Sequence, residues 1–446
     1  MLLFLSFKGV ERLSMMPETE PKHTRHKPAL ALVLSILYAG LGQLYNRRWG
    51  KGLTLILFMT AFIIVFADFI GLGLWGITTL GTLQGVDHSI MLLIQGLISI
   101  FILVAFLVFY VVNIIDAYKE AIRIQDGHRS FTIRESFRST YDKSFPYLLL
   151  SIPMVLMSFI VILPLIFMVL LAFTDYHLYN APPANLLNWV GFDNFIALFT
   201  VDIWQNTFFS VLSWTVVWTL VATTLQVSLG LFLAVLVNDK RVKYKRLIRT
   251  VLILPWAVPA FVTILIFSAM FNDGFGAINR DLLIPLFGLE IPWQSDPFWT
   301  RTALIMIQTW LGFPFVFALF TGVLQSVSKD WYEAADVDGA SRFSKFTKIT
   351  LPHILYATAP LLIMQYAMNF NNFNIIYLFN EGGPAIRGQN AGGSDILISW
   401  VYSLTFQNQN YNMAAVISLI IGLIVCSVAF WQFRQTRSYK EEGKVF

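Results

Sequence analysis

Long apolar runs recur along the whole chain, and they constrain its fold more than any other feature of the sequence. A run of roughly 20 apolar residues can cross the hydrocarbon core of a bilayer as one helix. Only helices and closed barrels satisfy their backbone hydrogen bonds in lipid. The sequence therefore predicts an all-α polytopic membrane protein of about eight transmembrane helices. The expected spans are 51–71, 88–115, 146–173, 206–237, 247–271, 302–326, 354–377 and 412–431.

Composition agrees with a membrane protein. Charged residues make up 13% of the chain, whereas soluble domains carry about 25%. The single cysteine, Cys426, lies in an apolar run, so the chain can form neither an internal disulfide nor a cysteine metal site. We read the net charge of +5 as basic cytoplasmic connections and not as a nucleic-acid surface.

The basic residues predict the orientation of the spans. If the 332–354 connection is inside, the outside connections of the chain hold only Arg280, Arg301 and Arg387, and the inside connections hold the other loop Lys and Arg. The first 27 residues are also basic, so both termini are expected in the cytoplasm of a bacterial cell. The stretch 28–45 is short and broken by Gly40 and Gly42. An eight-span chain needs it to be interfacial or re-entrant, and we favour this over nine spans. The N-terminal basic residues are Lys8, Arg12, Lys22, Arg25 and Lys27.

Three regions follow from this pattern. Residues 1–27 form a cytoplasmic tail, and 28–145 form a membrane region with the interfacial or re-entrant element, two spans and a polar cytoplasmic segment. Residues 146–446 form a six-span core.

The core has no visible energy source of its own. Its predicted spans hold no charged residue in their interiors, although ion-coupled carriers generally need one. The Gly50-Lys51 and Gly443-Lys444 pairs lack the other residues of a phosphate-binding loop. We therefore expect no catalytic residue, no metal and no cofactor, and we expect a separate partner to supply the energy.

A polar stretch at 332–352 interrupts the apolar core and suits contact with such a partner. Gly339 can adopt a positive φ and reverse the chain between two short helices. An apolar residue recurs every third position on the second helix, and Pro352 is expected to end that helix. Glu333, Arg342 and Lys348 are charged residues available for pairing at the rim. The residues expected to make the coupling contact are Glu333, Ala334, Ala335, Gly339, Phe343, Phe346, Ile349, Leu351 and Pro352.

This pattern resembles the EAA loop of binding-protein-dependent ABC importer permeases, and the stretch 204–432 resembles the MalF-type subunit of maltose and maltodextrin importers. The resemblance implies a type I ABC importer permease fold, with the loop docked as coupling helices in a cytoplasmic ATPase. It also implies a heterodimer with a MalG-type permease, two ATPase copies and an extracellular or lipid-anchored solute-binding protein. That protein would meet the outside loops at 174–205 and 381–411. The large insert of Gram-negative relatives is absent from the short 174–205 loop.

The resemblance also implies a sugar site within the membrane. Amide side chains can bind sugar hydroxyls, and Gln365, Asn369 and Asn372 are spaced to share one helical face. Trp256 lies between two prolines that can bend its helix. Maltose-specific relatives usually have other residues at several of these positions, so the exact sugar stays open. The expected substrate-binding residues are Trp256, Ala260, Gln308, Trp310, Leu311, Gly312, Gln365, Met368, Asn369 and Asn372.

Other interpretations remain at this point. Buried amides also join transmembrane helices to one another, so these residues could be structural. The substrate could be a galacto-oligosaccharide or a glycerol-phosphate-like solute instead of a maltodextrin, or the chain could be a stand-alone facilitator. Trp293, Trp299 and Trp400 are expected at the membrane interface and not at the sugar.

Overall fold

The computed structural model describes residues 26–239 and 241–435, which divide into two compact units. Unit 1 contains the described residues up to Phe167 and the short segment Pro182–Leu186. Unit 2 contains Met168–Ala181 and the described residues from Leu187 onward. The predicted tail 1–27, apart from His26 and Lys27, lies outside the described residues, as do Lys240 and residues 436–446. The predicted region boundaries at 27 and 145 stay predictions.

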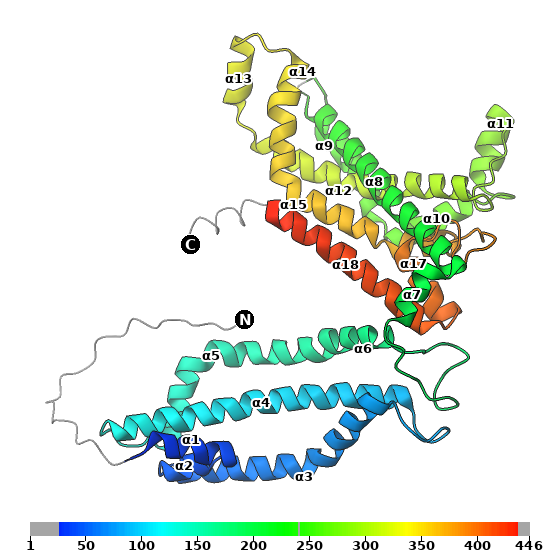
Figure 1. Ribbon diagram of the computed structural model, residues 1–446. Helices are drawn as coiled ribbons and strands as arrows, with labels where there is room; N and C mark the ends of the chain where they lie inside the picture. The colour runs from blue at the N-terminus through cyan, green and yellow to red at the C-terminus, as the bar shows by residue number, and fades with distance from the viewer. Residues whose placement is uncertain (1–25, 240, 436–446) are drawn as a thin grey trace. The chain divides into compact units, whose positions relative to one another are not determined.

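Unit 1 is built from helices, of which α3 and α4 lie side by side (Figure 1). Its elements are α1 (Pro28–Leu37), α2 (Leu41–Tyr45), α3 (Trp49–Thr79), α4 (Ser89–Gln125), α5 (Ile133–Met157) and the π-helical turn η1 (Ser158–Ile162). The boundary between the units falls within α6 (Leu163–Leu171).

Unit 2 is also helical, and the described residues form isolated β-bridges but no β-strand. Its long helices α8 and α12 pack against each other and against α15. The elements are α7 (Asp193–Thr200), α8 (Asp202–Asn238), α9 (Lys245–Ala257), α10 (Ala260–Met270), η2 (Ile278–Leu283), α11 (Ile284–Phe287), α12 (Pro297–Ser326), α13 (Lys329–Val337), α14 (Arg342–Lys345), η3 (Phe346–Thr350), α15 (Leu351–Phe370), α16 (Phe373–Asn380), α17 (Leu397–Tyr402), η4 (Ser403–Gln407) and α18 (Tyr411–Gln435).

The all-α membrane fold predicted from the sequence is confirmed. Among the described residues, 6 helices are long and apolar enough to cross a membrane, and α9 with α10 would form a seventh span. The seventh predicted span, 354–377, is divided between α15 and α16, and it does not pass the same test. Its polar residues, such as Gln365 and Asn369, lower its mean hydropathy, and these are residues expected at the sugar site.

The short stretch 28–45 folds as two helices that turn back on themselves at Gly40. Helix α1 has 10 residues and is about 15 Å long at 1.5 Å per residue, too short for a bilayer core of about 30 Å. The two ends of the stretch meet. His26 Nε2 lies 2.8 Å from Asn46 Oδ1, the rings of His26 and Tyr45 stack at 4.3 Å, and the Lys27 N–H donates to the Tyr45 hydroxyl.

A polar cluster holds this element against α4. The Gln43 amide donates to Asn113, and Asn46 Nδ2 donates to the Ala117 carbonyl at 2.7 Å. The Asp116 carboxylate pairs with Arg48 at 3.1 Å and with Lys51 at 2.9 Å. These contacts join the start of α3 to the C-terminal part of α4.

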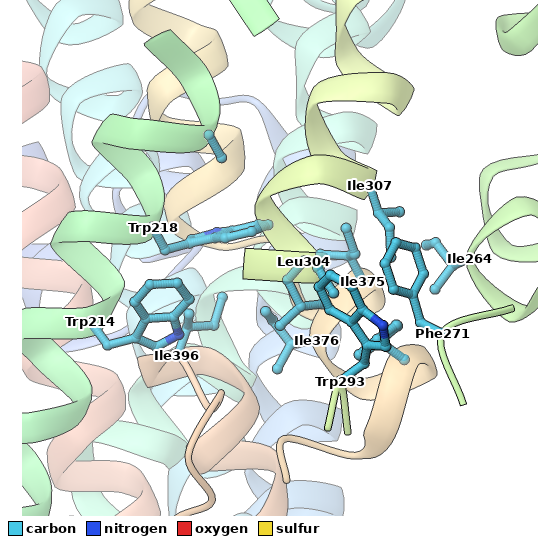
Figure 2. Close-up of a cluster of buried hydrophobic side chains, with 13 residues drawn as sticks. Trp214, Trp218, Ile264, Phe271, Trp293, Leu304, Ile307, Ile375, Ile376 and Ile396 are labelled. Atoms are coloured by element: carbon cyan, nitrogen blue, oxygen red, sulfur yellow. The ribbon is translucent and has the colours of Figure 1, made fainter. Parts of the chain in front are cut away.

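The core of unit 2 is a cluster of aromatic and aliphatic side chains between α8, α12 and α16 (Figure 2). Trp214 and Trp218 enter it from α8, and Ile375 and Ile376 enter it from α16. Trp293 belongs to this cluster, and Trp400 is 0% exposed. Packing within unit 2 thus buries both rings, and the position at the membrane interface expected for Trp293, Trp299 and Trp400 stays a prediction.

The loop after α16 is fastened to this core. Trp214 Nε1 donates to the Ser394 carbonyl at 3.0 Å, and Arg301 Nε donates to the Gly393 carbonyl at 2.7 Å. Asp395 is buried beside them, where its carboxylate accepts hydrogen bonds from Ser399 Oγ and the Gly392 N–H. Burial raises the pKa of the Asp395 carboxyl to about 6. The loop is thus a rigid surface built on α8 and α12.

Candidate functional site

A cavity of about 630 Å³ opens where α9 and α10 meet α12, α15 and α16. Its volume falls within the range of small-molecule sites. Helices α9 and α10 meet at 85°, and the break contains Val258 and Pro259. The bend follows from Pro255 and Pro259, since proline cannot donate a backbone hydrogen bond within a helix. The break exposes Trp256, whose ring packs edge-on against Phe315 at 5.8 Å.

Amide side chains form the polar wall of the cavity. Gln308 and Asn372 both line it, and Asn372 Nδ2 donates to Gln308 Oε1 at 3.1 Å. Gln308 Nε2 donates in turn to Asn369 Oδ1 at 2.9 Å. None of the described lining residues carries a charge, so the wall suits a neutral ligand with hydroxyl groups. The full lining is Pro255, Trp256, Ala257, Val258, Pro259, Ala260, Ile264, Gln308, Leu311, Gly312, Phe315, Met364, Gln365, Met368, Asn372, Asn374 and Ile375.

Most of the substrate-binding residues expected from the sequence lie on this cavity. Those that line it are Trp256, Ala260, Gln308, Leu311, Gly312, Gln365, Met368 and Asn372. Two do not line it. Asn369 is 2% exposed and lies behind the wall. Trp310 points elsewhere on α12, with its ring against Phe313. The sequence missed Phe315, Met364 and Asn374, because no residue pattern marks these helical residues as part of a cavity wall.

The predicted coupling loop folds as a helical hairpin, α13 followed by α14. Gly339 has a φ of +71°, the left-handed conformation that reverses the chain between the two helices. Ser328 and Ser341 cap α13 and α14 by accepting hydrogen bonds from the Asp330 and Ser344 N–H groups. The Lys345–Asp336 ion pair and the 2.8 Å contact between the hydroxyls of Tyr332 and Thr350 join the two arms.

The prediction that Pro352 ends the second helix of the hairpin is wrong. Helix α14 continues through the π-helical turn η3 into α15, and Leu351 keeps helical φ and ψ angles. The Leu351 N–H donates across this wider turn to the Phe346 carbonyl. Pro352 then falls in the first turn of α15, where a missing N–H is tolerated. The hairpin is therefore joined rigidly to α15, which lines the cavity.

The hairpin presents a groove and an exposed apolar side chain. The groove, about 600 Å³ in volume, contains four of the residues expected to make the coupling contact: Ala334, Ala335, Ile349 and Pro352. Phe343 is 76% exposed, which is unusual for a phenylalanine outside lipid. Glu333, Arg342 and Lys348 are exposed around it. Phe346 and Leu351 are half-buried.

The chain has clear relatives. Residues 226–438 match the family described as binding-protein-dependent transport system inner membrane component. The chain is 51% identical to the galactooligosaccharides transport system permease protein GanP of Bacillus subtilis (strain 168), over 93% of this chain and 99% of that protein. The chain belongs to this family. The family resemblance predicted from the coupling loop is thereby confirmed.

Other relatives agree with this membership. The maltodextrin transport system permease protein MdxF of Bacillus subtilis (strain 168) is 44% identical over 94% of this chain and 98% of that protein. A bacterial ABC transporter involved in alginate import aligns with a TM-score of 0.56 at 20% identity, covering 68% of this chain and 99% of the solved one. That structure supports the fold alone. As a member of the family, the chain is a multi-pass membrane permease subunit and not an enzyme.

Proposed function

We propose that this permease translocates a neutral oligosaccharide, in the first place a maltodextrin, as the MalF-type subunit of an ATP-driven importer. The observation that carries the proposal is the uncharged cavity of about 630 Å³ with Trp256, Gln308 and Asn372 on its wall. Carboxamides can donate to and accept from hydroxyl groups, and the indole ring offers a flat apolar face. The absence of a cation among the described lining residues disfavours a phosphorylated or acidic solute.

A galacto-oligosaccharide is the second candidate, because the chain is more similar to GanP (51%) than to MdxF (44%). Uptake of labelled maltotriose and of a β-linked galactotriose by the reconstituted importer separates the two. Preferential maltotriose uptake supports the first proposal, and preferential galactotriose uptake supports the second. A chain that transports either sugar without partner subunits or ATP is a facilitator, which would overturn both.

The partners of the permease follow from its surfaces. The groove between α13 and η3, with Phe343 exposed beside it, suits a cleft in a cytoplasmic ATPase, of which two copies would serve a heterodimer with a MalG-type permease. On the opposite side, the fastened loop after Asn380 and the loop between α6 and α7 would receive the sugar from an extracellular or lipid-anchored binding protein.

We propose that both termini are cytoplasmic. The two ends of the stretch 28–45 meet through His26, Tyr45 and Asn46, so this element re-enters the side from which it came. The basic residues Arg48 and Lys51 at the start of α3 mark that side as the cytoplasm. Helix α3 is then the first complete span.

Cysteine labelling tests this topology. In a chain in which Cys426 is replaced by alanine, single cysteines are introduced by Lys27→Cys, Leu83→Cys and Asp126→Cys, all at exposed positions. A membrane-impermeant maleimide applied to intact cells should label Leu83→Cys alone, and it should label all three after permeabilisation. Labelling of Lys27→Cys in intact cells would mean that 28–45 crosses the membrane.

Substitution of Asn372 tests the sugar site. Asn372→Ala removes a cavity-lining amide and the hydrogen bond to Gln308, so the KM for oligosaccharide uptake should rise about tenfold. Asn371→Ala is the matched control, because Asn371 is exposed and does not line the cavity. If both variants transport at the wild-type rate and KM, the amides are contacts between helices and the proposed site is wrong.

A further inference from the structure

Two fully buried polar residues on α8, Thr223 and Gln226, lie behind the amide wall of the cavity. Neither lines the cavity, and nothing in the sequence pattern of this apolar helix singles them out. Burial of a polar group in a membrane protein is costly unless the group is hydrogen-bonded. Their position next to the proposed sugar site therefore requires an explanation.

Thr223 ends a chain of hydrogen bonds that begins at the cavity. Asn372 Nδ2 donates to Gln308 Oε1 at 3.1 Å, and Gln308 Nε2 donates to Asn369 Oδ1 at 2.9 Å. Asn369 Nδ2 then donates to Thr223 Oγ1 at 2.8 Å. Each carboxamide donates away from the cavity to the next residue. The chain thus runs in one direction, from α16 through α12 and α15 to α8.

The backbone of α15 is held at the same point. Trp218 Nε1, one turn before Thr223 on α8, donates to the Asn369 carbonyl at 2.9 Å. Asn369 is therefore bound to α8 through both its side chain and its backbone. The direction of the Asn369 amide sets the direction of Gln308, and Gln308 in turn sets that of Asn372.

Gln226 reaches the wall from behind through a gap left by Gly312. Gln226 Oε1 lies 3.5 Å from Gln308 Nε2, the longest contact of the network. A Cβ at position 312 would lie 1.8 Å from Gln226 Oε1, so the side chain of Gln226 occupies the space that a larger residue would need. Gln226 Nε2 is buried and has no hydrogen-bond partner among the described residues.

We propose that Thr223 and Gln226 are positioning residues of the oligosaccharide site, which orient Gln308 and Asn372 from the second layer. With its Nδ2 donating to Gln308, Asn372 keeps its carbonyl oxygen and its second N–H for hydroxyl groups in the cavity. The described residues make no hydrogen bond to Asn372 Oδ1. This inference rests on the proposed function. It adds that the direction of the buried hydrogen-bond chain, from Asn372 to Thr223, determines which hydroxyl groups of the sugar the site binds.

The test compares two threonines on the same helix in the reconstituted importer, with maltotriose and galactotriose as probes. Thr223→Val removes the acceptor for Asn369 Nδ2, and we expect the KM of uptake to rise about tenfold while kcat changes less than about twofold. Thr223→Ser keeps the acceptor and should restore the KM. Thr219→Val is the matched control, because the Thr219 hydroxyl bonds the Thr215 carbonyl of its own helix.

Gln226→Met gives a second measurement that does not depend on Thr223. Methionine has a similar length and no donor, so the variant removes both the contact to Gln308 and the unpaired Nε2. We expect an unchanged or higher unfolding temperature of the purified importer together with a several-fold higher KM. A residue that merely joins helices would instead lower the unfolding temperature and leave the KM unchanged.

The outcomes separate the inference from the proposed function. If the wild-type importer takes up neither probe, the proposed function fails, and the inference fails with it. If the wild type transports but Thr223→Val matches Thr219→Val, or Thr223→Ser restores nothing, only the inference is overturned. A drop in kcat at constant KM, in Thr223→Val or Gln226→Met, also overturns it.

Discussion

Replacement of Gly312 with alanine is expected to raise the KM of oligosaccharide uptake by about 10- to 100-fold, from an overpacking cost of roughly 1–3 kcal/mol. The new Cβ would lie 1.8 Å from Gln226 Oε1 and 2.6 Å from its Cδ. Gln226 is buried, so its side chain cannot swing into solvent. The clash must therefore displace Gln226 or push α12 away from α8, and either movement changes the orientation of Gln308 at the cavity.

Gly322→Ala is the matched control for this variant. Gly322 lies on the same helix α12, and a Cβ there would meet nothing within 4 Å. It should transport like the wild type and gain roughly 0.5–1 kcal/mol in helix stability. A Gly312→Ala, Gln226→Ala double variant frees the space, so its KM should fall below that of Gly312→Ala, to the several-fold increase expected from the loss of Gln226 alone. Wild-type uptake by Gly312→Ala alone would show that the close approach of α8 and α12 is not needed.

Replacement of Gly339 with proline is expected to reduce uptake and transport-coupled ATP hydrolysis to background. Gly339 has a φ of +71°, whereas the proline ring holds φ near −65°. The hydrogen bond from the Gly339 N–H to the Asp336 carbonyl is also lost. The hairpin cannot keep its turn, and the proposed ATPase contact on Ala334 and Phe343 should be lost. The measurement is ATPase co-purification together with uptake in proteoliposomes.

Two further variants make this test specific. Gly339→Ala should give a partial loss, because a Cβ at this position meets nothing within 4 Å and only the positive φ is unfavourable. Gly85→Pro makes the same change at another turn, where φ is +80° and a Cβ would meet nothing within 4 Å. Gly85 is far from the hairpin in the sequence, so this variant should leave ATP coupling intact. Normal uptake by Gly339→Pro would remove the coupling role of the hairpin.

The amide residues show how much of the candidate site helical periodicity can predict. Spacings of four and three residues place Gln365, Asn369 and Asn372 on one face of a continuous helix. In the structure α15 ends at Phe370, and Asn372 lies beyond it at the start of α16. Gln365 and Asn372 line the cavity, whereas Asn369 is turned toward Thr223. The break between α15 and α16 and the packing of α8 decide which of these amides lines the cavity and which bonds another helix. Neither feature can be read from the residue spacing.

Proline positions show the same division. Pro255 and Pro259 predict a bend near Trp256, and the chain bends there by 85°. Pro352 predicts a helix end, but α14 continues through the π-helical turn η3 into α15, and Pro352 falls in the first turn of α15. A proline removes one donor wherever it stands. Whether the helix then breaks depends on how the preceding turn is hydrogen-bonded and packed.

The sequence alone was sufficient to predict the membrane fold, the chain reversal at Gly339 and the family. These predictions depend on the length of apolar runs, on a glycine that can adopt a positive φ and on a motif of fixed spacing, all of which are properties of neighbouring residues. The amide wall is different. Gln308 and Asn372 in the wall and Gln226 behind it are far apart in the chain, and whether each faces the cavity, another amide or a helix depends on contacts between α8, α12 and α15. Hydrogen-bond direction in a buried network is a property of all its members together, so it is settled only when the helices are packed.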